Sequence, residues 1–139
     1  MEKFYATGKI LGSRFMHREG KPSEDAILAC RVIDRTLRPL FDQSIRHAVQ
    51  IIVTVISVDD NDSTILAVNA ASLALAVSNI PWNGPIGCVR IGKYDSENLI
   101  INPSQKLRED DSQYKFDLTV CGKNGNINMI EASAHQTTE

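Results

Sequence analysis

The sequence has few cysteines, and their spacing excludes the common cysteine-based scaffolds. Cys30, Cys88 and Cys121 lie far apart, no CxxC pair occurs, and each sits within an apolar run. Zinc-binding modules and disulfide-stapled small domains need closely spaced or numerous cysteines. We therefore expect reduced core cysteines rather than metal ligands or disulfide halves.

The sequence also lacks a segment that could cross a membrane. Its longest apolar run, Ile65 to Val77, is interrupted by Asn69 and Ser72 and is shorter than the roughly 20 residues that a spanning helix needs. The opening residues, MEKFYATGKI, carry charges where a signal peptide has its apolar segment. These features predict a cytoplasmic protein without membrane contact, and 139 residues are enough for one domain.

A strong overall charge is absent as well, because the net charge is only −2. The charge is unevenly distributed: residues 1–50 hold nine Lys/Arg and six Asp/Glu, whereas residues 51–139 hold six and eleven. The N-terminal part is thus +3 and the remainder −5. This asymmetry indicates either a local anion site or a chance cluster, and it argues against a protein coated with nucleic acid.

Two helices are predicted. Pro22-Ser23-Glu24 has the residues of a helix start, with Ser23 as N-cap and acidic residues in the first turn. This helix should continue through AILACRVIDRTLR and end before Pro39. TILAVNAASLALAVS, residues 64–78, is apolar nearly all round, as in a central buried helix.

Five segments have the residues of β-strands. VQIIVTVISV, residues 49–58, is apolar and β-branched almost throughout, which predicts a strand buried on both faces. The others are IGCVRIGKY, NLIINP, FDLTVCG and INMIEASA, the last two joined by the Asn-Gly turn in KNGN. The order of elements predicts an α+β fold. No hairpin-forming segment precedes the first helix, so we expect an incomplete domain.

Cations gather on the loop and first helix. The helix arginines are spaced i, i+4 and i+7, so they share one face, and Asp34 could neutralise some of them. Guanidinium groups bind phosphate bidentately, and an exposed aromatic ring can stack on unpaired bases. The residues therefore favour single-stranded RNA or DNA as a ligand, with intrahelical salt bridging as the alternative. The candidate binding residues are Phe15, Met16, His17, Arg18, Arg31, Arg35 and Arg38.

The same residues resemble a known family. GSRFMHREGKPSEDAILACRVIDRTLRPLF, VQIIVTVISVD, SNIPWNGPIGCVRIG, NLIINPS and FDLTVCG occur in the order found in bacterial polynucleotide phosphorylase. The similarity is to the first of that family's two RNase PH-like core domains. It implies an α+β, RNase PH-like core with a mixed sheet and packed helices, lacking its N-terminal part. On this reading, residues 1–139 form a partial domain, with an RNA-gripping loop region in 1–22 and a helix/strand core in 23–139.

The resemblance also implies a function. The family is a trimeric 3′–5′ phosphorolytic exoribonuclease, a polyribonucleotide nucleotidyltransferase that acts in mRNA degradation, uses Mg²⁺ or Mn²⁺ with inorganic phosphate, and can join RNA-degradation complexes. Its RNA-gripping loop has two phenylalanines followed by two arginines, which match Phe15, Met16, His17 and Arg18 here. Methionine and histidine at two of these positions weaken stacking and charge.

The resemblance places the chemistry elsewhere. The family's serine-rich turn, two aspartates and lysine belong to its second core domain; the matching positions here keep only Ser72 and Asp117, with Thr119 in place of the lysine. The acidic run at residues 109–111 is typical of a solvated loop. We therefore expect no catalytic and no metal-binding residue, and no cofactor bound by this chain alone. Arg90, in an otherwise apolar strand, needs either a carboxylate or contact with solvent, and Glu131 is the candidate carboxylate.

Two alternatives remain beside the leading hypothesis that this segment mainly supplies RNA-binding surface to the enzyme. The chain could be a non-catalytic single-stranded RNA-binding module. It could also be a truncated structural remnant.

Overall fold

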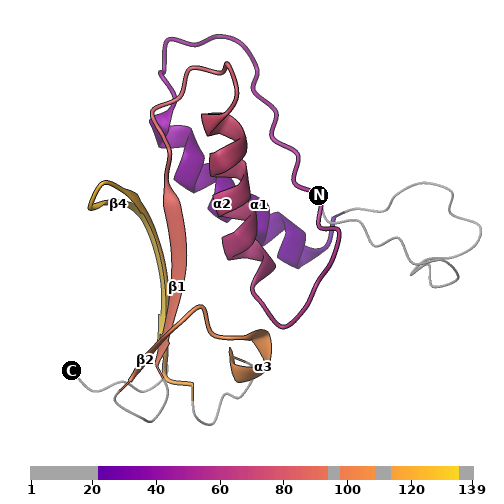
Figure 1. Ribbon diagram of the computed structural model, residues 1–139, viewed down its shortest axis with the longest axis vertical. Helices are drawn as coiled ribbons and strands as arrows, with labels where there is room; N and C mark the ends of the chain where they lie inside the picture. The colour runs from indigo at the N-terminus through magenta and orange to yellow at the C-terminus, as the bar shows by residue number, and fades with distance from the viewer. Residues whose placement is uncertain (1–21, 94–97, 109–113, 135–139) are drawn as a thin grey trace, which may run out of the picture.

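A computed structural model describes residues 22–93, 98–108 and 114–134. The longer helices are α1 (Glu24–Leu37), followed by the 3₁₀ turn η1 (Arg38–Leu40), and α2 (Ser63–Ala76); a short helix, α3 (Gln105–Arg108), was not predicted. The strands are β1 (Gly87–Lys93), β2 (Leu99–Ile101), β3 (Phe116–Lys123) and β4 (Asn126–Ala134). Helices α1 and α2 lie together against one side of the sheet (Figure 1). The predicted α+β class is confirmed.

Helix α1 begins and ends as the sequence predicts. The Ser23 side chain accepts a hydrogen bond of 3.2 Å from the Ala26 amide, and Glu24 and Asp25 lie in the first turn. Proline then limits the other end, where η1 replaces regular α-helix. Local capping and backbone restriction therefore define this helix.

The described sheet has four strands in the order β2-β1-β3-β4, antiparallel throughout rather than mixed. The Asn-Gly turn joins β3 to β4 as predicted, because Asn124 and Gly125 both have positive φ, 52° and 80°. That conformation matches the twist of a two-residue hairpin. The described helices include none long and apolar enough to cross a membrane.

The core lies between the two helices and the sheet, and polar side chains of α2 help to position it. Buried apolar residues include Leu37, Val68 and Cys121. Ser72 donates a hydrogen bond of 2.8 Å to the Ile86 carbonyl and accepts one of 3.0 Å from its amide. Asn69 makes the same pair of contacts with the Cys88 backbone, at 3.0 and 2.8 Å. The two polar interruptions of this apolar helix therefore attach it to the beginning of β1.

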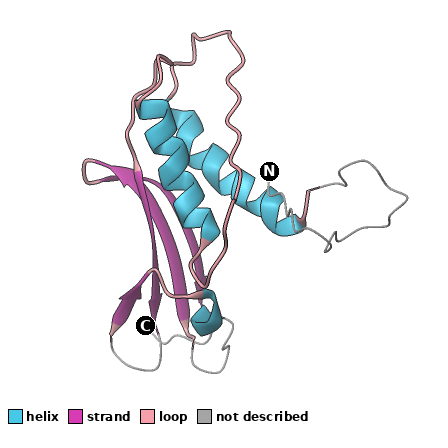
Figure 2. Cartoon of the chain, turned by 45° about the vertical axis from the view of Figure 1, so that its right-hand side comes forward, coloured by secondary structure: helices cyan, strands magenta, loops and turns pink. Residues whose placement is uncertain are grey.

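The prediction for residues 49–58 is wrong. This segment forms no strand, and Ile52, Ile56 and Val58 are exposed rather than buried, with Ile56 95% exposed. The chain runs beside the helices, on the side away from the sheet (Figures 1 and 2). A strand is stabilised by a paired neighbour, and none of the described strands pairs with this segment.

Candidate nucleic-acid interface

The three predicted arginines are all exposed, two on α1 and one at the start of η1. Arg31, Arg35 and Arg38 follow the predicted i, i+4, i+7 spacing, and none is buried. Asp34 accepts hydrogen bonds from both Nε and Nη2 of Arg38, at 3.0 and 2.7 Å. The salt-bridge alternative is therefore correct for Arg38. Within the described ranges, no carboxylate forms an ion pair with Arg31 or Arg35.

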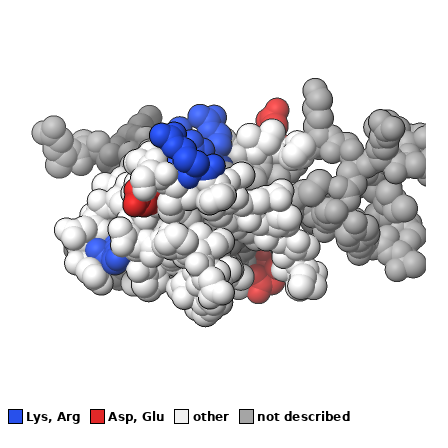
Figure 3. Space-filling view, turned by 90° about the horizontal axis from the view of Figure 1, so that it is seen from above, with Lys and Arg blue, Asp and Glu red and all other residues white. Residues whose placement is uncertain are grey.

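Positive charge is also concentrated in space. Seen from above, most of the visible Lys and Arg surface gathers in one compact patch and a smaller cationic group lies apart from it, whereas Asp and Glu side chains appear singly (Figure 3). A concentrated cationic surface on an acidic chain favours a local polyanion contact.

The loop residues of the predicted interface lie outside the described residues. These are Phe15, Met16, His17 and Arg18, and the acidic residues Glu109, Asp110 and Asp111 lie outside as well. The structure therefore brings together only the helix part of the predicted site.

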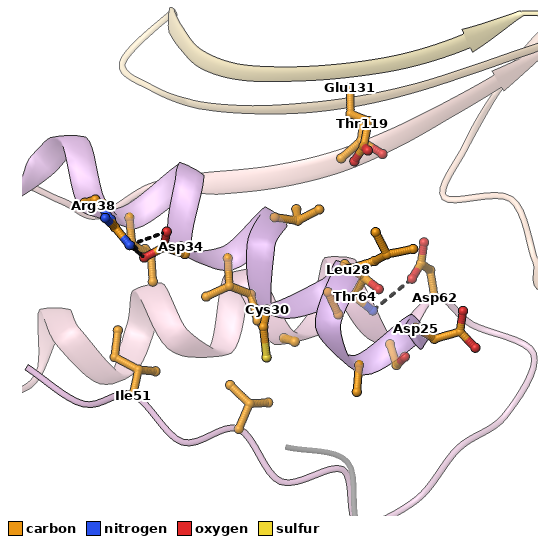
Figure 4. Close-up of a pocket in the computed structure, with 18 of the residues that line it drawn as sticks. Asp25, Leu28, Cys30, Asp34, Arg38, Ile51, Asp62, Thr64, Thr119 and Glu131 are labelled. Atoms are coloured by element: carbon orange, nitrogen blue, oxygen red, sulfur yellow. Dashed lines mark hydrogen bonds and ion pairs between the residues drawn. The ribbon is translucent and has the colours of Figure 1, made fainter. Parts of the chain in front are cut away.

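A cavity of about 1120 Å³ opens beside α1. Figure 4 shows Arg38 joined to Asp34 at one end of the helix, with Thr119 and Glu131 reaching from the sheet toward the helix. Its lining carries six carboxylates but only three arginines; the carboxylates are Asp25, Asp34, Asp42, Asp62, Asp117 and Glu131. This excess of negative charge disfavours an RNA strand inside the cavity and leaves the exposed arginine face as the polyanion surface.

Arg90 pairs with a different acid from the one predicted. Its Nη1 forms an ion pair with Asp62, and its Nε lies 3.4 Å from Asp117 and donates to Thr119 at 3.1 Å. Glu131, the predicted partner, forms no ion pair with any described residue. Glu131 is opposite Thr119 on the neighbouring strand, but α2 brings Asp62 closer.

The sequence alone did not identify Asp62 as the partner. Asp62 is the N-cap of α2, and its side chain accepts a hydrogen bond of 2.8 Å from the Thr64 amide. Its other oxygen pairs with Arg90, so one buried carboxylate joins the helix start to the sheet. A lone arginine in an apolar strand was the available signal, because a buried charge requires an opposite charge nearby.

This arrangement does not fit a divalent metal. Asp62 and Asp117 are the two carboxylates gathered in the cluster, and both contact the Arg90 guanidinium. A metal there would meet the positive charge of Arg90 and would have to compete with it for the two carboxylates. The described residues contain no group of three or more potential metal ligands. Ser72 is likewise committed to the Ile86 backbone and offers no phosphate cradle.

Two other side chains refine the sequence interpretation. Cys30 is exposed on α1, contrary to the expectation of a core cysteine, whereas Cys88 and Cys121 are buried. Trp82 packs near Phe41, with 6.3 Å between ring centroids, and donates to the Leu37 carbonyl at 3.4 Å. It therefore holds its turn against the end of α1.

Comparison with known proteins defines the class. Residues 1–81 match the 3′ exoribonuclease family, domain 1, also called RNase PH. Because this match covers more than half of the chain, the protein belongs to that family. It is an RNase PH-like domain.

The similar full-length proteins are polyribonucleotide nucleotidyltransferases. That of Halothermothrix orenii is 52% identical over 139 residues, which is 99% of this chain and 19% of the relative. Those of Fervidobacterium nodosum and Thermomicrobium roseum are 46% and 49% identical, over 100% and 99% of this chain and 20% and 17% of the relatives. The chain thus spans about a fifth of the length of the curated relatives that it matches.

Proposed function

We propose that this chain is part of a 3′–5′ phosphorolytic exoribonuclease and that its main contribution is RNA-binding surface. The exposed α1 face carries the proposal, because Arg31 and Arg35 point two guanidinium groups outward without a described acidic partner. Such groups can neutralise successive phosphates of a flexible strand. Phe15, Met16, His17 and Arg18 complete the proposed RNA contact.

The chemistry is assigned to other parts of the complete enzyme. There, inorganic phosphate attacks the terminal linkage of RNA and a nucleoside diphosphate leaves. We propose Mg²⁺ or Mn²⁺ as its metal, a homotrimer as its assembly and the cytoplasm as its location, with RNA-degradation proteins as further partners. The Asp62–Arg90–Asp117 cluster supports this division, since the Arg90 guanidinium lies against both carboxylates and would repel a metal cation there.

Binding of a fluorescent oligoadenylate tests the proposal. We expect Arg31→Gln with Arg35→Gln to weaken binding and to reduce the slope of log affinity against log salt by about 1.4, or about 0.7 per lost contact to a single strand. Arg38→Gln is the matched control, because Asp34 already neutralises that guanidinium, and we expect a smaller change. Equal effects of all three replacements, or none, would contradict the assignment.

Turnover separates this proposal from its alternatives. The chain alone should release no nucleoside diphosphate from polyadenylate when phosphate is added with Mg²⁺ or Mn²⁺. Phosphate-dependent release would show that the chain itself is catalytic. An independent RNA-binding module would be favoured by two results together. The chain would bind RNA in a salt-sensitive way, and replacing the arginines in the complete enzyme would leave its activity unchanged. No RNA affinity together with a broad thermal transition would favour a structural remnant.

A further inference from the structure

Two cysteines that are 33 positions apart in the sequence meet in the sheet. Cys88 of β1 and Cys121 of β3 are directly opposite each other in the antiparallel register. Their sulfur atoms share a hydrogen bond of 2.8 Å. Cys121 is fully buried, and Cys88 is 8% exposed. Both are free thiols.

The backbone already satisfies the geometric needs of a cross-link. Opposite residues of an antiparallel pair have Cα atoms about 4.5–5.5 Å apart, and disulfides accept Cα separations of about 4.4–6.8 Å. Because both sulfurs are on the helix side of the sheet, within the core cluster, a bond between them needs no change of register. Cys30 is exposed on α1 and outside this cluster, so it provides an internal comparison.

The surroundings make the two thiols unequal. The hydrogen bond shared with Cys88, together with the nearby Thr36 side chain, lowers the pKa of Cys121 against the opposing effect of burial. The same shared bond and burial raise the pKa of Cys88. A thiol with a lowered pKa beside one with a raised pKa is suited to a reaction in which the first sulfur attacks an oxidant and the second resolves the product.

We propose that Cys88 and Cys121 form a reversible dithiol–disulfide pair that hydrogen peroxide closes across β1 and β3. In the first step the Cys121 sulfur attacks one peroxide oxygen, the O–O bond breaks, and water leaves after proton transfer. The product is the sulfenic acid of Cys121. In the second step the Cys88 sulfur attacks that sulfur, the S–O bond breaks and a second water leaves. Two thiols and one peroxide thus give one disulfide and two waters, with both sulfurs oxidised and peroxide reduced.

The disulfide would fix the middle of the sheet. It links two strands that already pair along seven positions, and Cys121 also contacts Thr36 in the last turn of α1. A cross-link between residues far apart in the sequence lowers the conformational entropy of the unfolded chain. The melting temperature of the folded protein therefore rises. A small dithiol reverses the reaction, so the pair is reduced in a reducing compartment and closes under peroxide stress.

Alkylation and mass spectrometry of the folded chain test the proposal. After stoichiometric peroxide, quenching and unfolding, we expect two of the three thiols to resist alkylation. Peptide mapping should join the Cys88 and Cys121 peptides, with Cys30 still alkylated. The melting temperature should rise by several degrees and return to its first value after dithiothreitol treatment. Cys30→Ser should behave like the unaltered chain.

Two further variants and a denatured sample distinguish a specific Cys88–Cys121 disulfide from nonspecific oxidation of thiols. Cys88→Ser, whose hydroxyl keeps a hydrogen-bond donor beside Cys121, should prevent the disulfide and leave a Cys121 sulfenic acid that a cyclic diketone reagent traps. Cys121→Ala should give no trapped product at Cys88. The same peroxide treatment in concentrated guanidinium chloride should slow the Cys88–Cys121 reaction at least tenfold. Pairing through Cys30, persistence of all three thiols, or equal rates in folded and unfolded chains would overturn the proposal.

Discussion

Strand β3 and residues 49–58 are both rich in apolar residues and both are predicted as strands, but only β3 becomes one. β3 lies between β1 and β4 and is paired on both sides, and its Thr119 and Cys121 are buried. Residues 49–58 have no paired neighbour among the described strands, and Ile56 is almost fully exposed. The comparison shows that high β-propensity makes a segment suitable for a strand, but that a strand forms only where a neighbouring strand can pair with it.

The same contrast separates two parts of the molecule. The closed region, α2 with the four strands, pairs its largely buried arginine with an acid at the start of α2, as the Asp62–Arg90 pair shows. The open region, residues 41–58, exposes apolar side chains and contributes only part of the cavity lining. Changes of one residue type should therefore have very different consequences in the two regions.

Loss of the buried arginine should have the largest effect. Arg90→Met leaves Asp62 and Asp117 without their cation and should lower the unfolding free energy by about 3–5 kcal/mol, as expected when one partner of a buried pair is removed. Arg46→Met, at an exposed arginine of the open region, should change it by less than about 0.5 kcal/mol. Urea unfolding followed by circular dichroism measures both. Equal small changes would show that the cluster is hydrated and contributes little.

Matched isoleucines give the next comparison. Ile65 is 5% exposed on α2, whereas Ile56 is 95% exposed. Ile65→Ala should cost about 2–5 kcal/mol because it removes a buried side chain and leaves a cavity, and Ile56→Ala should cost less than about 0.5 kcal/mol. The urea concentration at the unfolding midpoint measures both changes, provided that the dependence of unfolding free energy on urea concentration keeps the same slope. If Ile56→Ala were the more damaging change, residues 49–58 would be packed in solution and the contrast would fail.

A smaller effect is expected at alkaline pH. Burial, followed by the nearby Asp117 charge, raises the pKa of Tyr114 from its ordinary value near 10 to about 12. The folded chain therefore keeps this proton where the unfolded chain loses it, so the stabilisation is complete below pH 10 and declines as the pH rises toward 12.

Unfolding midpoints measured from pH 9 to 12 would detect this decline, and Tyr114→Phe should show less of it. An identical pH dependence in both chains would show that Tyr114 does not contribute. Tyrosinate absorbance, compared between the two chains, gives the pKa directly.

Much of the fold could be predicted from residues that are close in the sequence. The Ser23 cap, the helix end before Pro39 and the Asn124–Gly125 turn are all observed. That Arg31, Arg35 and Arg38 share one face also followed from helical spacing. Each of these features depends on contacts within one or two turns of chain, so nothing distant could alter them.

The failed predictions all depend on distant contacts. The partner of Arg90 comes from 28 residues away, across the helix–sheet contact. The buried or exposed position of Cys30 depends on how α1 rotates against the core. The expected strand at 49–58 required a neighbour that its own residues could not provide.

The sequence by itself determined where α1 begins and ends, which arginines share its face, and where the β3–β4 hairpin turns, because capping, side-chain spacing and backbone restriction act locally. Only the tertiary structure decided that Asp62 neutralises Arg90, that Cys88 meets Cys121, and that residues 49–58 remain outside the sheet. These outcomes join residues that are far apart in the chain. Ion pairs and strand ladders form only where packing brings both partners within a few ångströms.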